Sequence, residues 1–115
     1  MLEASDQIHY WCLWNKRLDD RLFKNQILRA LYSISNNIAE GFERETPKEF
    51  KRFLVIAKAS NGEVRSMLYL AEHFNYISKN EFESFKNESE EISKMIGGLI
   101  NYLNSKIENW KTLFW

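Results

Sequence analysis

Apolar residues recur every three or four positions over most of the chain, which is the spacing of one face of an α-helix. The clearest run follows the segment 46–49, where Thr46 can cap a helix, Pro47 suits its first position and Glu49 can complete a capping box. We predict a helix from about Pro47 to about Phe74, roughly 40 Å long at 1.5 Å per residue. The positions on its inner face are Phe50, Phe53, Leu54, Ala57, Asn61, Val64, Leu68 and Ala71.

One further helix is predicted before this one and one after it. The segment 78–81 repeats the capping pattern and begins a second long helix, whose interior holds Gly97–Gly98. Paired glycines there indicate either close approach of a neighbouring helix or a slight bend. A further helix runs from about Lys24 to Phe42, with Gly41 placed as a C-terminal cap would be. The apolar positions are Ile27, Leu31, Ile34 and Ile38 in the earlier helix, and Phe82, Phe85, Ile92, Met95, Ile96, Leu99, Leu103, Ile107 and Trp110 in the later one.

The first helix is the least regular part of the pattern. Ile8, Trp11, Cys12, Leu18 and Leu22 fit one face, and the chain could break anywhere between about 15 and 25. Helices joined by short loops are usually antiparallel neighbours. We therefore predict an all-α, antiparallel up-and-down four-helix bundle with a short or irregular first helix, formed by residues 1–115 as one domain.

Composition narrows the classes of function. Sixteen Lys and Arg balance sixteen Asp and Glu among 115 residues, so no global field gathers polyanions, although a local basic face remains possible. Cys12 is the single cysteine, which excludes an intrachain disulfide and a cysteine metal cage. No apolar run approaches the roughly 18 residues that span a bilayer. The N-terminus lacks the regions of a signal peptide, and we expect a cytoplasmic protein.

The middle of the chain resembles a known bacterial family. Residues 26–41 read QILRALYSISNNIAEG and residues 44–77 read RETPKEFKRFLVIAKASNGEVRSMLYLAEHFNYI. These segments resemble the small four-helix-bundle proteins first noticed as reading frames inside intervening sequences of 23S rRNA genes, over about residues 26–103. The positions that match the family pattern are Gln26, Arg29, Ala30, Ser33, Ile34, Asn37, Ile38, Ala39, Glu40, Gly41, Arg44, Lys48, Glu49, Phe50, Phe53, Leu54, Ile56, Ala57, Ser60 and Glu63.

The resemblance implies a bundle that assembles into a ring, commonly a pentamer, and it implies no established reaction. Related bundles are accessory proteins of reverse transcriptases in diversity-generating retroelements, where rings contact RNA and the polymerase. The N-terminus departs from the family pattern, because a loop containing Phe-Pro is missing and about 15 residues are absent. Either the first helix is short or the first two helices are nearly continuous. The C-terminal SKIENWKTLFW resembles an extension.

Two polar groups are candidates for function. The polar stripe, as we call it, follows one side of the helix over residues 24–42 and faces two residues of the next helix. It is interpreted as a buried or half-buried network that fixes helix register, with a ligand site as the alternative. The basic strip lies on the outer face of the helix from Pro47 and is either a phosphate-binding surface or a solvated face paired with Glu45 and Glu49. The stripe comprises Arg29, Ser33, Asn37, Glu40, Ser60 and Glu63, with Arg44 at its end, and the strip comprises Arg44, Lys48, Lys51, Arg52 and Lys58.

Aromatic residues gather near both termini. Because an antiparallel bundle of four helices brings its termini to one end, Trp11 and Trp14 are expected either to pack against the C-terminal group or to cover a neighbouring subunit. The C-terminal group is Trp110, Phe114 and Trp115.

Metal and nucleophile chemistry find little support in the residue pattern. His73 directly follows Glu72, and Asp6-x-x-His9 occurs once, whereas di-iron bundles need paired Glu-x-x-His motifs. Cys12 between Trp11 and Leu13 is interpreted as a small packed residue. We expect no cofactor, no metal, no membrane contact and no small-molecule substrate.

The leading hypothesis is a non-enzymatic homo-oligomeric scaffold, a pentamer by resemblance. It binds RNA or an RNA-handling protein such as a reverse transcriptase or a ribosomal component. The alternative is a protein-interaction module without a nucleic-acid role, which the neutral charge favours.

Overall fold

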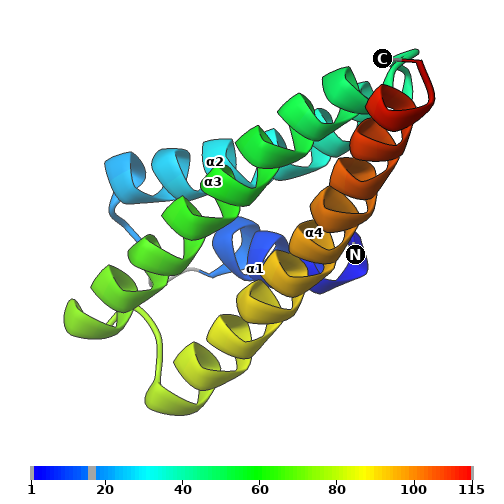
Figure 1. The fold of residues 1–115 in the computed structure, drawn as a ribbon. Helices are drawn as coiled ribbons and strands as arrows, with labels where there is room; N and C mark the ends of the chain where they lie inside the picture. The colour runs from blue at the N-terminus through cyan, green and yellow to red at the C-terminus, as the bar shows by residue number, and fades with distance from the viewer. Residues whose placement is uncertain (1, 16–17, 115) are drawn as a thin grey trace.

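The computed structural model describes residues 2–15 and 18–114, with the side chains of residues 2–6 and 114 left out of the description. Over these residues the chain forms four helices: α1 at Leu2–Trp14, α2 at Arg21–Phe42, α3 at Pro47–His73 and α4 at Lys79–Phe114. Figure 1 shows α2, α3 and α4 as long antiparallel rods, with short α1 at the opening between α2 and α4. The predicted all-α bundle is confirmed, and the elongated molecule measures 57 × 22 × 19 Å.

Local sequence signals place the helix ends. Thr46 caps α3 by accepting a hydrogen bond from the Glu49 N–H, with Pro47 at the first position, as predicted. Ser78 and Glu81 form the reciprocal capping box that begins α4, because each side chain accepts the other residue's backbone N–H at 3.1 Å.

The turn between α3 and α4 is a Schellman motif. The Tyr76 N–H donates to the Ala71 carbonyl at 2.8 Å, and the Asn75 N–H donates to the Glu72 carbonyl at 3.0 Å. This geometry requires a left-handed residue, and Asn75 supplies it with a φ of 61°. Asparagine tolerates that conformation better than most residues with a Cβ.

The break between α1 and α2 falls within the predicted range. Asp20 caps α2 by accepting from the Phe23 N–H at 3.0 Å, and its other carboxylate oxygen accepts from the Tyr76 hydroxyl at 2.8 Å. Both hydrogen bonds favour the charged form, so they hold the pKa of Asp20 below its ordinary value. Asp20 thereby joins the start of α2 to the α3–α4 turn.

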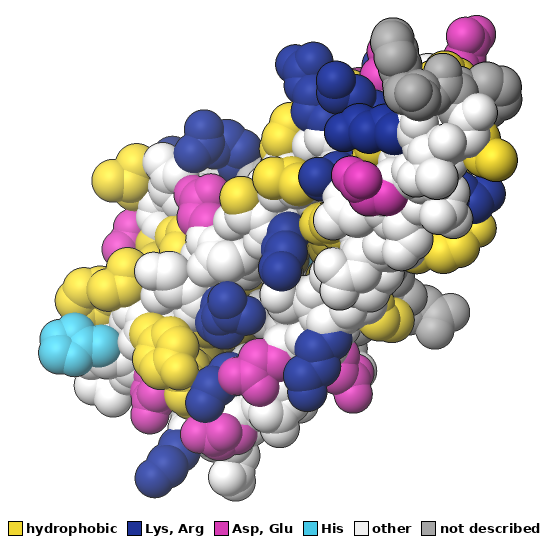
Figure 2. All heavy atoms as spheres, in the orientation of Figure 1, with side chains coloured by type: hydrophobic (Ala, Val, Ile, Leu, Met, Phe, Trp, Pro, Cys, Tyr) yellow, Lys and Arg dark blue, Asp and Glu magenta, His cyan; other side chains and the backbone are white. Residues whose placement is uncertain are grey.

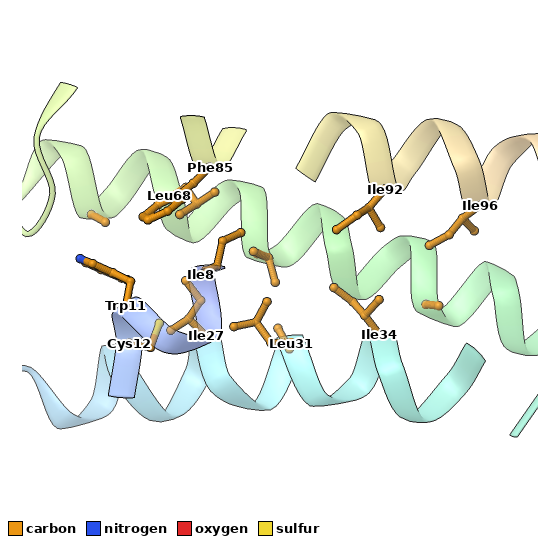
Figure 3. Close-up of a cluster of buried hydrophobic side chains, with 14 of the residues drawn as sticks. Ile8, Trp11, Cys12, Ile27, Leu31, Ile34, Leu68, Phe85, Ile92 and Ile96 are labelled. Carbon is orange, nitrogen blue, oxygen red and sulfur yellow. The ribbon is translucent and has the colours of Figure 1, made fainter. Parts of the chain in front are cut away.

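One apolar core runs through the bundle. Figure 3 shows Ile27 and Ile34 of α2 facing Leu68 of α3 and Ile92 of α4. Helix α1 adds Ile8, Trp11 and Cys12 to this core, as its pattern predicts. Leu22, by contrast, is 73% exposed, because it lies on the outer face of the first turn of α2 rather than on a continuation of α1.

A buried polar pair joins α3 and α4 inside the core. The Asn61 side-chain amide donates to the Ser89 carbonyl at 2.7 Å, and the Ser89 hydroxyl donates to Asn61 Oδ1 at 3.0 Å. Asn61 is 1% exposed and Ser89 is 0% exposed. Polar groups so deeply buried need partners, and the pairing fixes how α3 and α4 lie against each other along their length.

The glycines differ from two of the sequence expectations. Gly41 lies within α2 rather than at its cap, which is Glu43. A Cβ at Gly41 would lie 2.7 Å from Cδ1 of Phe50 and 3.2 Å from Cβ of Phe53. The missing side chain of Gly41 therefore allows α2 and α3 to approach closely near their turn. Among the described residues, no neighbouring helix approaches Gly97 or Gly98 in that way: a Cβ at Gly97 would meet only Lys58 Nζ, at 3.5 Å, and a Cβ at Gly98 would meet no atom of another helix within 4 Å.

The described helices contain no segment that is both long enough and apolar enough to cross a membrane.

Candidate nucleic-acid interface

The basic strip predicted from the sequence lies on the first half of α3 and the turn before it. Lys48, Arg52 and Lys58 are exposed, and Lys51 is partly exposed. Arg44 lies in the turn, where its guanidinium carbon sits 4.9 Å from the centre of the Phe53 ring. This cation–π contact fixes the stem of Arg44 at the start of the strip.

The strip divides between two faces of α3. Arg52 and Lys58 are both exposed, but Lys58 reaches across to α4 and places its Nζ over Gly97. Lys51 and Arg65 lie seven residues before and after Lys58, so all three share the edge of α3 that borders α4. The small Gly97 leaves room for the lysine side chain to cross between the helices.

Helix α4 continues this line of positive charge. Lys86 of α4 lies with its Nζ 5.9 Å from the ring centre of Tyr69 on α3. Charge interaction and hydrogen bonding with Tyr69 raise the pKa of Lys86 above its ordinary value, so the side chain stays cationic at neutral pH. We call the set Lys51, Lys58, Arg65 and Lys86 the basic row. Figure 2 shows dark-blue side chains at intervals along the seam between α3 and α4, with magenta acidic groups beside some of them.

The cations of the row are not neutralised by close ion pairs. Among the described residues, ion pairs within 4.0 Å join Arg29 to Glu63 and Lys111 to Glu108. The ion pairs with Glu45 and Glu49 that the alternative interpretation of the strip expects are therefore not among the pairs within 4.0 Å. Arg65 was absent from the sequence-based strip, although its spacing of seven residues from Lys58 was a usable signal.

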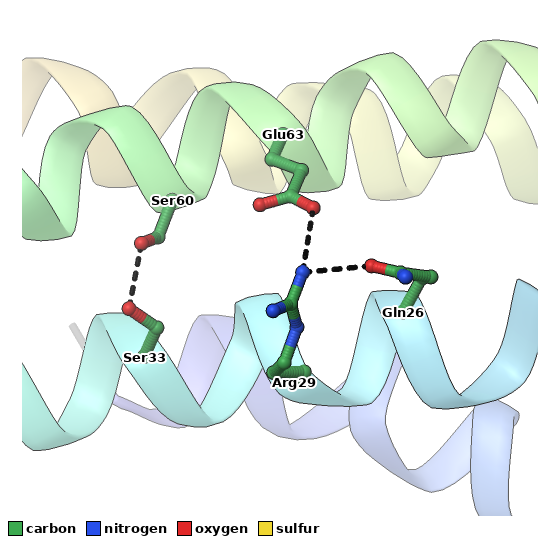
Figure 4. A network of polar contacts seen from close by, with 5 residues as sticks. All are labelled: Gln26, Arg29, Ser33, Ser60 and Glu63. Atoms are coloured by element: carbon green, nitrogen blue, oxygen red, sulfur yellow. Dashed lines mark hydrogen bonds and ion pairs between the residues drawn. The ribbon is translucent and has the colours of Figure 1, made fainter.

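The polar stripe is a shallow network between α2 and α3, as Figure 4 shows. The hydroxyls of Ser33 and Ser60 lie 2.7 Å apart and are half-buried. The Asn37 amide donates to the Ser33 carbonyl at 2.7 Å and to the Ser33 hydroxyl at 3.1 Å. These three residues form the half-buried network that the sequence indicated.

The charged members of the stripe are not buried. The Arg29 guanidinium donates to Gln26 at 2.9 Å and lies 3.8 Å from Glu63, but the side chains of Arg29 and Glu63 are 72% and 46% exposed. Glu40 is exposed and lies eleven residues from Arg29 on the same helix. The expected burial is thus wrong for the charged members of the stripe, because these positions lie on the rim of the α2–α3 contact.

The two aromatic groups lie far apart. Trp11 packs against Phe85, with ring centres 5.9 Å apart, so Trp11 and Trp14 lie beside the first turns of α4. Trp110 is 25 residues further along α4, roughly 37 Å away at the helical rise. The alternative in which the two groups pack together is therefore wrong, because a first helix of 13 residues ends at the opposite end of the bundle, and contact with a neighbouring subunit stays a prediction. The Phe114 side chain and Trp115 lie outside the described residues.

Cys12 has the properties of a packed residue. It is 0% exposed, and burial raises its pKa to about 12, which leaves almost no thiolate at neutral pH. Among the described residues, no group of three or more His, Cys, Asp or Glu side chains is placed to hold a metal ion.

Comparison with known proteins agrees with the fold and with the motifs of α2 and α3. The family described as 23S rRNA-intervening sequence protein matches residues 3–98. A crystal structure from Bacteroides thetaiotaomicron, described as a protein with unknown function from the S23 ribosomal protein family, is 32% identical. It superposes with a TM-score of 0.78 over 86% of this chain and 93% of that chain. No curated protein matches the chain. The chain belongs to the 23S rRNA-intervening sequence protein family.

Proposed function

We propose that this protein is a non-enzymatic, homo-oligomeric scaffold that binds RNA along the seam between α3 and α4. The observation that carries the proposal is the basic row, whose cations share one seam and are free of ion pairs within 4.0 Å among the described residues. Lysine and arginine side chains bind nucleic acid mainly by neutralising phosphates. Since the chain is neutral overall, affinity has to come from this local surface and from its repetition in an assembly.

Assembly is supported by an uncovered flank of α4. Glu81, Glu88, Met95 and Tyr102 follow one another at steps of seven and therefore share one side of the helix. Glu81 lies beside α1, whereas Met95 and Tyr102 lie further along α4 and are 43% and 54% exposed. A longer first helix would cover this flank, and a second copy of the chain can do so here. The pentamer remains our best single expectation for the number of subunits, from the family resemblance.

A salt-dependent binding assay tests the RNA proposal. We expect the change of the four basic-row residues, Lys51, Lys58, Arg65 and Lys86, to Gln to weaken RNA binding and to flatten its dependence on salt. With about 0.7 counterions released per phosphate contact on a single strand, four lost contacts lower the slope of log K against log salt by about 3. The matched control changes the same number of charges on exposed positions of α4 away from the row, namely Lys79, Lys94, Lys106 and Lys111.

The outcomes separate the proposal from its alternative. Equal loss in both variants would mean that total charge and not the row matters. An unchanged affinity in the row variant, with folding intact, would move the site elsewhere. No RNA binding by the parent at low salt would favour the protein-interaction module. Light scattering at low micromolar concentration tests assembly, and a stable monomer of 13.8 kDa would refute it.

A further inference from the structure

An aromatic pocket opens at the end of the bundle where α1 ends and α3 turns into α4. Its volume is about 870 Å³, which is within the usual range for binding sites of small molecules. The aromatic lining consists of Tyr10, Trp11, Trp14, Tyr76 and Phe85. The basic row lies on a different edge of α4, so this pocket is not part of the surface already described.

Among the described residues, one buried hydrogen-bond donor in the pocket wall has no acceptor. Trp11 is 8% exposed, and its indole Nε1 finds no hydrogen-bond partner in the part of the chain that the structure describes. Figure 3 shows this nitrogen directed away from the centre of the bundle, toward the end where α3 turns into α4. An unpaired buried N–H is unfavourable and rare. A ligand that brings an acceptor to the indole would therefore give this donor a partner.

Two other rings are held open to solvent at the rim. Tyr10 is 67% exposed and Trp14 is 69% exposed, and their ring centres lie 6.2 Å apart with planes tilted by 42°. The two residues are one helical turn apart on α1, which places them on the same side of the pocket. Exposed aromatic faces of this kind are the platforms on which planar rings stack.

The polar lining limits the charge of the ligand. Gln7 and Asn75 are among the lining residues, and side-chain amides of their kind can offer both donors and acceptors to the edge of a planar molecule. Glu81 brings a carboxylate, one oxygen of which already accepts the Ser78 N–H at 3.1 Å. A carboxylate disfavours an anion, and an ammonium group would leave the Trp11 donor unpaired. A neutral planar ring with carbonyl acceptors fits all of these groups.

We propose that the aromatic pocket binds an unstacked nucleobase of single-stranded RNA whose phosphates lie along the basic row. This inference rests on the proposed function and identifies the form of RNA that the protein takes. Phe85 in the pocket and Lys86 in the row are adjacent on α4, and successive helical residues point about 100° apart. An RNA strand whose phosphates follow the row as far as Lys86 therefore has to turn around one side of α4 to place a base in the pocket beside Phe85. RNA-binding proteins commonly stack splayed bases on aromatic side chains in this way.

The test follows the indole N–H of Trp11 by two-dimensional ¹H–¹⁵N NMR of the full chain. The probes are uridine, whose ring carbonyls are acceptors, a short oligouridylate, and an abasic ribose phosphate oligomer of equal length. We expect uridine and the oligouridylate to shift the Trp11 signal in a saturable way and the abasic oligomer to leave it in place. Trp14→Ala should weaken oligouridylate binding by about fivefold or more, the loss expected for one stacked base. Trp110→Ala, which removes an exposed ring at the far end of α4, should leave binding unchanged.

The outcomes distinguish this inference from the proposed function. If changing the basic-row residues to Gln weakens binding, but Trp14→Ala does not and the Trp11 signal stays fixed, RNA binding stands and the pocket inference fails. If no oligomer binds, RNA binding along the row fails and the pocket inference fails with it, even where uridine alone shifts the Trp11 signal, because the pocket would then bind a free base and not a base of RNA. An equal shift with the abasic oligomer overturns the pocket inference, because the base would then play no part. Trp11→Phe, which keeps the packing and removes the donor, should lower uridine affinity while the fold is retained.

Discussion

The Asn61–Ser89 pair gives a sharp test of how the core is held in register. Asn61→Ala removes two hydrogen bonds, one at 2.7 Å and one at 3.0 Å, and leaves the Ser89 hydroxyl without its acceptor in a site that is 0% exposed. At about 1 kcal/mol per bond, with the cavity left by the amide added, we expect a loss of about 2–4 kcal/mol in the free energy of unfolding. Ser89→Ala removes one bond and strands Asn61 Oδ1, at a cost of about 1–3 kcal/mol.

The double variant decides whether the pair acts as a unit. Once both side chains are alanine, no stranded partner remains on either helix, so the double variant should lose about 1 kcal/mol less than the sum of the two single losses. The assay is urea unfolding at one fixed protein concentration, because the stability of an assembly depends on concentration. Losses that add within about 0.3 kcal/mol would refute the reasoning, since the two residues would then be energetically independent.

Other predictions test separate features of the fold and need only standard measurements. Gly41→Ala should lower the urea midpoint, by about 1–3 kcal/mol in unfolding free energy, because its Cβ has no room. The matched Gly98→Ala should raise stability by up to about 1 kcal/mol, and equal effects would contradict the steric argument. Cys12 should react with a disulfide-exchange reagent only in urea, so rapid reaction in native buffer would show that its site opens. The pKa of Asp20 is lowered in the fold, so its contribution is present above about pH 4 and lost as the pH falls further. Asp20→Asn should therefore flatten the acid end of the stability profile, and an identical profile would exclude this role. Arg29→Ala should change stability by no more than about 0.5 kcal/mol, and a larger loss in thermal melting would show that its ion pair matters.

The long helices could be predicted from the sequence because local signals and periodicity agree in them. Thr46-Pro47 and Ser78-Glu81 specify helix starts through chemistry that acts within one turn. Helix α1 was harder, because its 13 residues carry a mixed apolar pattern and its end depends on contacts with α2 and α4. Leu22 illustrates the difficulty, since it continues the spacing of α1 but lies after the break.

The candidate site depends on contacts between helices, which periodicity reports only in part. Spacing on one helix is enough to group Lys51, Lys58 and Arg65, but Lys86 joins them only through the packing of α4. The aromatic pocket was not predicted, because it combines the end of α1 with the α3–α4 turn. The burial of Arg29 was also predicted wrongly, because helical spacing shows on which side of the helix a residue lies but not how much of that side the neighbouring helix covers.

The end of α4 has a consequence for how assembly can be detected. From Glu108 to Leu113 every residue is exposed, so these last turns bury little of their side-chain surface. A helical end of this kind opens readily in an isolated molecule, and its amide protons should exchange with solvent within the time of mixing. Contact with a neighbouring subunit would slow that exchange. Hydrogen exchange at this one segment therefore reports subunit contact from within the chain.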